Sequence, residues 1–396
     1  MYQGISIEEF RDITDQKIDR ERKLDLSVNI HKLKRWWWRS RLVPLANRNV
    51  ELSLKEHDFL FGVNAGGFGN PGFEDMVSKL FNYITIGTFW KYCEPQKGNY
   101  DFSMQKWIGN WANDRGIVTK AHPLVYNLDV VLPDFCKTPT MDEWRVYTKA
   151  VVEALHEQID IWEVVNEFMH EPVADAASPF FWVKAWANEL GSDPTLAVNE
   201  YGPVFGHITD DYINICKGAS DGNVPLDIVG VQSHVADNSV FDYDVMETNL
   251  NKFNALKEDI HITEITVHSD ENIPVNNCPG HNNWSEALQA QEIEKIYRLQ
   301  FANPAISAIT YWAGIDGDPW RPHTGLLRTD GTQKLSYGVV DDLINSKWTT
   351  REAGRTNSRG DFNFRGFPGV YDVKLDGQIV GEVDLTSDDT HGEVRL

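Results

Sequence analysis

The segment Asp160–Glu167 reads DIWEVVNE, an apolar and β-branched run that ends in an amide and a carboxylate. A short apolar run bounded by polar residues predicts a strand that is buried on both faces. A carboxylate directly after such a strand is costly unless it is paired or used. The segment is therefore interpreted as a buried strand whose carboxyl end reaches a functional site.

Seven further runs of the same kind lie before and after this segment. They are Asp58–Ala65, Tyr83–Tyr92, Val118–Tyr126, Thr195–Tyr201, Asp227–His234, Ile260–Thr266 and Ile306–Ile315. Stretches with helical periodicity separate them. Eight strands that alternate with helices predict a closed (β/α)8 TIM barrel, because an open doubly wound sheet seldom needs eight consecutive units.

The two ends of the chain differ from this pattern. We expect a β-rich N-terminal segment at residues 1–57, a catalytic barrel at residues 58–347 and a β-rich C-terminal segment at residues 348–396. Neither end alone can bury much core, so the two are predicted to pair into one small β-sandwich accessory module. For the basic Trp36–Trp38 run, a strand packed on the barrel is favoured over a glycan-binding surface.

Composition excludes several classes of protein. The chain carries 59 acidic and 37 basic residues, a net charge of −22, so nucleic acid and anionic membranes are not expected as main partners. No apolar run is long enough to span a membrane, and four scattered cysteines form no zinc motif. The N-terminus lacks a signal sequence. We expect a secreted, periplasmic or cell-envelope protein without its signal, although a cytoplasmic location stays open.

Polar or aromatic residues stand at the predicted carboxyl ends of the strands, where a TIM barrel assembles its active site. They are Lys91, His122, Asn166, Glu167, Asn199, Glu200, Gln232, His234, Glu264, Trp312, Asp316 and Trp320. Glu167 and Glu264 belong to the fourth and seventh strands, which face each other across the barrel mouth. Glycoside hydrolysis needs such a carboxylate pair, one member protonated and the other ionised.

Neighbouring residues suit the same chemistry. Trp312 and Trp320 offer apolar faces to sugar rings, whereas Asn166 and Gln232 suit sugar hydroxyls. His234, next to a carboxylate, is placed to hold the nucleophile ionised. A single strand-end glutamate is more often an ion-pair partner, but matched polar residues at all the strand ends favour catalysis. No metal or organic cofactor is expected.

Several motifs resemble glycoside hydrolase family 10, the retaining endo-β-1,4-xylanases. WEVVNE at Trp162–Glu167 resembles its acid/base signature, GVQSH at Gly230–His234 its sixth strand, and ITEIT at Ile262–Thr266 its nucleophile strand. Further matches follow in the right order across about Phe59–Leu343. The resemblance implies that Glu167 is the general acid/base and Glu264 the nucleophile.

The same resemblance implies roles for the remaining site residues. They are Asn166 for the sugar 2-hydroxyl, Gln232 and His234 in support of the nucleophile, and Lys91, His122, Trp312 and Trp320 around the non-reducing-side sugars.

The sequence also departs from the family pattern. Gly87 and Thr88 replace the usual Glu-Asn, Tyr126-Asn127 replaces Trp-His, and Thr266 replaces an Asp. We therefore expect a divergent member that keeps the cleavage machinery, with Tyr126 among the residues of a remodelled substrate site.

The function predicted from the sequence is retaining hydrolysis of internal β-glycosidic bonds. The expected partner is a plant or algal polysaccharide or oligosaccharide, first of all β-1,4-xylan or a substituted xylan. Two alternatives stay open: a retaining hydrolase of a different β-glycan, and a non-catalytic carbohydrate-binding protein on the same barrel. An enzyme of phosphorylated metabolites would need a Gly-rich loop after strands seven and eight, where Trp312 and Trp320 stand instead.

Overall fold

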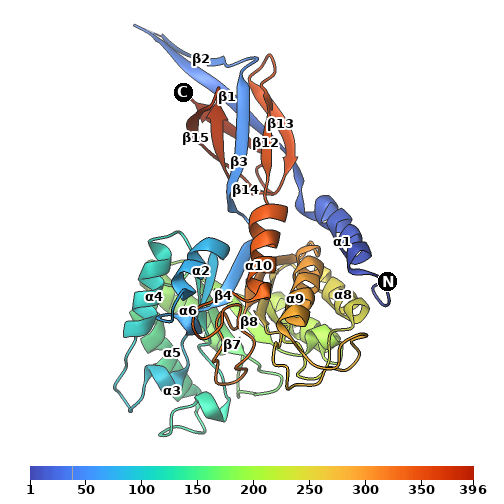
Figure 1. Ribbon diagram of the computed structural model, residues 1–396. Helices are drawn as coiled ribbons and strands as arrows, with labels where there is room; N and C mark the ends of the chain where they lie inside the picture. The colour runs from blue at the N-terminus through green and yellow to red at the C-terminus, as the bar shows by residue number, and fades with distance from the viewer. Residues whose placement is uncertain (38) are drawn as a thin grey trace. The chain divides into compact units, whose positions relative to one another are not determined.

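The computed structural model describes residues 1–37 and 39–396, without the side chains of Trp36 and Arg39. The chain forms two compact units, one of residues 1–10 and 61–340 and the other of residues 11–60 and 341–396 (Figure 1). Within the described residues, no helix has the length and apolar character needed to cross a membrane.

The first unit is a closed barrel of eight parallel strands in the order β10-β11-β4-β5-β6-β7-β8-β9. The strands are β4 (Leu60–Asn64), β5 (Tyr83–Gly87), β6 (Val118–His122), β7 (Ile161–Asn166), β8 (Thr195–Glu200), β9 (Ile228–Gln232), β10 (Asp259–Ile265) and β11 (Ile306–Tyr311). Each strand lies within one of the eight predicted runs, except that β10 begins one residue earlier, so the TIM-barrel prediction is confirmed.

Helices surround the barrel strands (Figure 1). They are α2 (Phe73–Leu80), α3 (Trp90–Cys93), α4 (Ser103–Asn113), α5 (Met141–Leu155), α6 (Ser178–Glu189), α7 (Thr209–Asp221), α8 (Tyr243–Lys252), α9 (Glu286–Phe301) and α10 (Leu335–Asp342). Short turns of helix lie at η1 (Ala65–Gly67), η2 (Asp129–Val131), η3 (Pro203–Phe205), η4 (Phe253–Ala255) and η5 (Leu343–Lys347).

Local sequence explains where individual helices begin and which face they bury. Helix α5 begins at a capping box, in which Thr140 and Glu143 satisfy each other's backbone N–H groups. Helix α2 buries Phe73, Val77 and Leu80, which share one face because they lie three or four residues apart.

The second unit contains two four-stranded sheets. One has the order β13-β1-β16 with β2 paired to β1, and the other has the order β12-β3-β14-β15. The strands are β1 (Leu24–Trp36), β2 (Arg39–Pro44), β3 (Asn49–His57), β12 (Arg351–Arg355), β13 (Asp361–Gly366), β14 (Gly369–Leu375), β15 (Gln378–Leu385) and β16 (His391–Arg395). Each sheet combines strands from both chain ends, so the predicted β-sandwich of both ends is confirmed.

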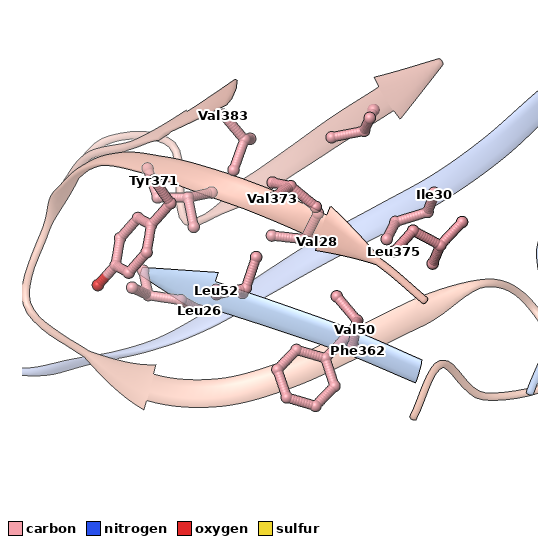
Figure 2. Close-up of a cluster of buried hydrophobic side chains, with 12 residues drawn as sticks. Leu26, Val28, Ile30, Val50, Leu52, Phe362, Tyr371, Val373, Leu375 and Val383 are labelled. Atoms are coloured by element: carbon pink, nitrogen blue, oxygen red, sulfur yellow. The ribbon is translucent and has the colours of Figure 1, made fainter. Parts of the chain in front are cut away.

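Alternate residues of β1 supply the core of this sandwich. Leu26, Val28 and Ile30 are buried against residues of the second sheet that include Leu52 and Val373 (Figure 2). The period of two follows from the pleat of a strand, which turns successive side chains to opposite faces.

Residues Ile7–Arg22 form helix α1, which differs from the β-rich segment expected for residues 1–57. Phe10, Thr14 and Ile18 are buried at a spacing of four, which is helical periodicity. Trp38 and the side chain of Trp36 lie outside the described residues, and Trp37 is 95% exposed. The interpretation of Trp36–Trp38 as a packed strand therefore stays a prediction.

Replacing Ile30 by Ala tests the sandwich core. Ile30 is fully buried, so I30A should lower the free energy of unfolding by about 2–5 kcal/mol. The matched control is I379A on β15, where the side chain is exposed and the expected change is within about 0.5 kcal/mol. Urea denaturation of both variants measures the difference, and equal losses would contradict the two-sheet core.

Candidate active site

A cavity of about 1100 Å³ is lined by residues at and beyond the carboxyl ends of the barrel strands. Eight of the ten residues predicted for the site line it: His122, Tyr126, Glu167, Gln232, His234, Glu264, Trp312 and Trp320. The other two, Lys91 and Asn166, are not part of the lining. Strand-end position thus brings together residues up to about 200 positions apart in the chain, as expected for this fold.

Glu167 directly follows β7 and has a positive φ of 53°. Its N–H donates to Asn199 O at 2.8 Å, which holds the chain in this unfavourable conformation. Its carboxylate accepts a hydrogen bond of 2.6 Å from the Tyr126 hydroxyl and one of 2.8 Å from Gln232 Nε2. Glu167 is therefore oriented by both its backbone and its side chain.

Glu264 lies near the end of β10 and is only 4% exposed. Its Oε1 accepts a hydrogen bond of 2.9 Å from Asn199 Nδ2, and its Oε2 lies 3.1 Å from His234 Nε2. Burial raises the pKa of Glu264 from 4.5 to about 8. The positive charges of His122 and Lys120 oppose that rise, whereas the negative charges of Glu163 and Glu167 add to it.

His234 connects Glu264 to a second layer of contacts. Its Nδ1 lies 3.0 Å from Thr266 Oγ1, and Arg321 donates to the same Thr266 oxygen at 2.8 Å. Burial, together with the positive charge of Arg321, lowers the pKa of His234 to about 3. The imidazole is therefore neutral at pH 7.

A buried ion cluster lies among the strands below the cavity. Glu163, inside β7, lies 2.9 Å from Lys120 Nζ and 2.7 Å from His122 Nδ1, and all three side chains are at most 2% exposed. Burial alone would raise the pKa of Glu163, but the His122 and Lys120 charges outweigh it and leave the pKa at about 2. The pairing holds the His122 ring beneath Trp312, whose ring centroid is 5.0 Å away.

Asn199, one of the polar residues at the strand ends, contacts the candidate nucleophile. Its Nδ2 bonds both Glu264 Oε1 and Asn166 Oδ1, the latter at 3.0 Å, while its Oδ1 accepts from Thr263 at 2.6 Å. Asn166 itself is buried behind the lining. The repeated Asn-Glu at the ends of β7 and β8 was the only sequence signal for this role.

The wall beside β5 is apolar. Lys91 lies on α3 with its Nζ 3.5 Å from Val130 O, whereas Phe89 and the 66% exposed Tyr92 line the cavity. Thr88 is buried and donates to Pro123 O at 2.9 Å. The positions that depart from the family's Glu-Asn pair therefore present no hydroxyl-binding side chain here.

Aromatic rings line other parts of the cavity. Trp320 is 56% exposed, and its ring centroid lies 4.8 Å from that of His234. Tyr201 stacks on His170 with centroids 3.8 Å apart, and His170 is held by Glu200 at 2.8 Å. Sequence reasoning did not select Tyr201, because an aromatic residue after a strand is equally typical of core. Within the described part of the chain, no three His, Cys, Asp or Glu side chains gather as a metal-binding group.

Comparison with known proteins places these features in context. Residues 53–342 match the family model of glycosyl hydrolase family 10. Endo-1,4-beta-xylanase B of Thermotoga neapolitana is 26% identical over 63% of this chain and 74% of its own length. The anti-sigma-I factor RsgI6 of Acetivibrio thermocellus is 22% identical over 97% of this chain, which spans 49% of that protein.

Solved structures of xylanases share the barrel fold. Xylanase 10B of Thermotoga petrophila in complex with xylobiose is 21% identical, with a TM-score of 0.60 over 73% of this chain and 95% of that one. Native xylanase 10B of Thermotoga maritima is 20% identical, with a TM-score of 0.60 over 73% and 96%.

The raised pKa of Glu264 predicts a pH-dependent effect of Glu264→Gln. Between about pH 4.5 and pH 8 the unfolded chain loses the Glu264 proton, whereas the folded protein keeps it. The free energy of unfolding therefore falls as pH rises through this range toward about 8. Glutamine carries no such charge. The melting temperature of E264Q relative to wild type should therefore rise by several degrees between pH 5 and pH 9.

The control for this measurement is Glu271→Gln, a change at an exposed residue of the segment after β10. Its melting temperature relative to wild type should stay constant over the same range. A constant difference for E264Q as well would contradict a raised pKa at Glu264.

Proposed function

The chain belongs to glycosyl hydrolase family 10, and from this membership we propose that it hydrolyses internal β-glycosidic bonds with retention of configuration. It is an endo-xylanase-like glycoside hydrolase by family. The observation that carries the proposal is that Glu167 and Glu264 line one cavity, each held by hydrogen-bonding neighbours from other strands. A retaining mechanism needs an acid/base and a nucleophile that can both reach one bound glycosidic bond.

In the proposed reaction, Glu167 donates its proton to the glycosidic oxygen while a Glu264 oxygen attacks the anomeric carbon. The bond to the leaving sugar breaks, and that sugar departs with the proton as a free hydroxyl. Glu167 then takes a proton from water, and the resulting hydroxide attacks the anomeric carbon. The ester bond to Glu264 breaks, which restores both carboxyl groups.

The environments of the two glutamates support the assignment of Glu167 as acid/base and Glu264 as nucleophile. Glu167 lies at the mouth, where its hydrogen bonds to Tyr126 and Gln232 leave it beside the open cavity. Glu264 is buried and held at both oxygens, as a nucleophile with one line of attack requires. Because burial raises its pKa to about 8, it must lose a proton before it attacks.

The proposed substrate is xylan, in particular a substituted xylan, or another β-linked polysaccharide. Exposed rings of Trp320 and Tyr201 offer surfaces for sugar stacking. The wall of Phe89 and Tyr92, which lacks the family's usual hydroxyl-binding pair, supports a substrate altered at that position. A polysaccharide substrate also implies that the protein acts outside the cytoplasm or in the cell envelope.

A second candidate is a carbohydrate-binding protein without turnover. The altered Gly87 and Thr88 favour it, whereas the presence of both glutamates favours hydrolysis. Binding to a glycan without release of reducing ends is the outcome that would select it.

Digestion of plain xylan, substituted xylans and other β-glycans tests the proposal. We expect new reducing ends, a preference for a substituted or non-xylan glycan, and β-configured products in NMR spectra taken before mutarotation. Equal rates on plain and substituted xylans, with no better substrate, would contradict the altered specificity. Initial α products would contradict retention.

Replacing Glu264 tests the nucleophile. E264Q should lower kcat by several orders of magnitude because the amide cannot form the glycosyl ester. The control E271Q changes an exposed glutamate of the same charge and should keep wild-type kcat. Circular dichroism checks that both variants fold. An E264Q rate above about a tenth of wild type would remove Glu264 from this role.

A further inference from the structure

We infer that Arg321 is a positioning residue for the nucleophile, which acts through Thr266 to hold His234 in the neutral form that donates its Nε2–H to Glu264. The inference rests on the proposed function, since it assigns a support to the proposed nucleophile. Its basis is one chain of contacts: Arg321 to Thr266 at 2.8 Å, Thr266 to His234 at 3.0 Å, and His234 to Glu264 at 3.1 Å.

The direction of each hydrogen bond follows from donor and acceptor capacity. A guanidinium only donates, so the Thr266 oxygen accepts from Arg321. Thr266 is fully buried, and across residues 1–37 and 39–396 its hydroxyl has no hydrogen-bonding neighbour other than Arg321 and His234. The hydroxyl proton therefore goes to His234 Nδ1. The ring proton must then lie on Nε2, where it points to Glu264.

Arg321 is itself held firmly in place. Its NH1 donates to Val235 O at 2.7 Å, and its NH2 lies 3.1 Å from Asp237 Oδ1. Its guanidinium also lies 4.4 Å from the centroid of the Trp320 ring. One side chain thus links the segment after β9, Thr266 after β10 and an aromatic wall of the cavity.

The charge of Arg321 has a second effect. Other ionisable groups surround His234 and Glu264. They are Lys120 and His122 in β6, Glu163 in β7, Glu167 directly after β7, and Asp318 near Arg321 in the chain. Arg321 differs from these groups because it bonds Thr266, and its charge opposes protonation of the imidazole. An Asp at position 266 would favour the imidazolium instead. The Arg-Thr pair therefore leaves a neutral donor beside the nucleophile.

Arg321→Met tests this assignment. Without the guanidinium charge, His234 gains a proton more readily, and the imidazolium stabilises the Glu264 carboxylate. The acidic limb of the kcat/KM profile should move to lower pH by about one unit or more. A merely structural role would lower kcat/KM equally at every pH and leave the limb in place.

Two further variants complete the design. Thr266→Val keeps the shape but removes the hydroxyl, so it should abolish the preference for the Nε2–H form without introducing a charge. Arg328→Met is the matched control: Arg328 belongs to the same segment after β11, but it bonds Glu286 and Gln333 O. R328M should leave the acidic limb of the kcat/KM profile at the same pH as in the wild type.

Nitrogen-15 NMR of the histidine rings measures the protonation state and tautomer of His234 directly and does not depend on catalysis. In the wild type, His234 should be the neutral Nε2–H form at pH 7, and its titration should move to higher pH in R321M. A wild-type imidazolium or Nδ1–H form, or an unchanged titration in R321M, would overturn the inference. If no glycan is cleaved but the R321M titration moves, the proposed function fails, while the control of His234 by Arg321 is supported.

Discussion

Eight parallel strands satisfy their backbone hydrogen bonds on both edges only when they close into a barrel. That closure brings the carboxyl ends of all eight strands around one opening, which is the constraint on which the site depends. Polar side chains at and below this opening are shut off from water and must satisfy one another. Lys120, Glu163 and His122 do so as a buried ion cluster, and Asn199 does so by bonding both Asn166 and Glu264.

The same closure gives the two glutamates unequal surroundings. Glu167 follows β7 in a left-handed conformation and accepts its hydrogen bonds at the cavity. Glu264 remains within β10, where burial raises its pKa to about 8. Two chemically identical groups thereby acquire different surroundings, and a two-step displacement by two carboxylates gives them different roles.

The sequence predicted the barrel strands and most of the residues that line the cavity, but not the contacts that hold those residues from behind. The barrel strands could be located because an apolar run followed by a helical period is a local signal. The residues toward the carboxyl end of each run therefore included Glu167, Glu264, Gln232 and His234. Arg321 carried no such signal, because its partners Val235, Asp237 and Thr266 come from other loops. Tyr92 lines the cavity wall and the predicted Lys91 does not, because successive residues of helix α3 point in different directions.

By itself the sequence determined the order of strands and helices in the barrel, the pairing of the two chain ends and the carboxylates at the barrel mouth. These follow from periodicity and from the cost of burying charge, both of which are read along the chain. The tertiary structure alone decided that Asn166 lies behind the lining, that Phe89 and Tyr92 form the wall beside β5, and that Thr266 joins Arg321 to His234. Such details depend on side-chain direction and on contacts between distant loops, which only closure of the barrel brings within hydrogen-bonding distance.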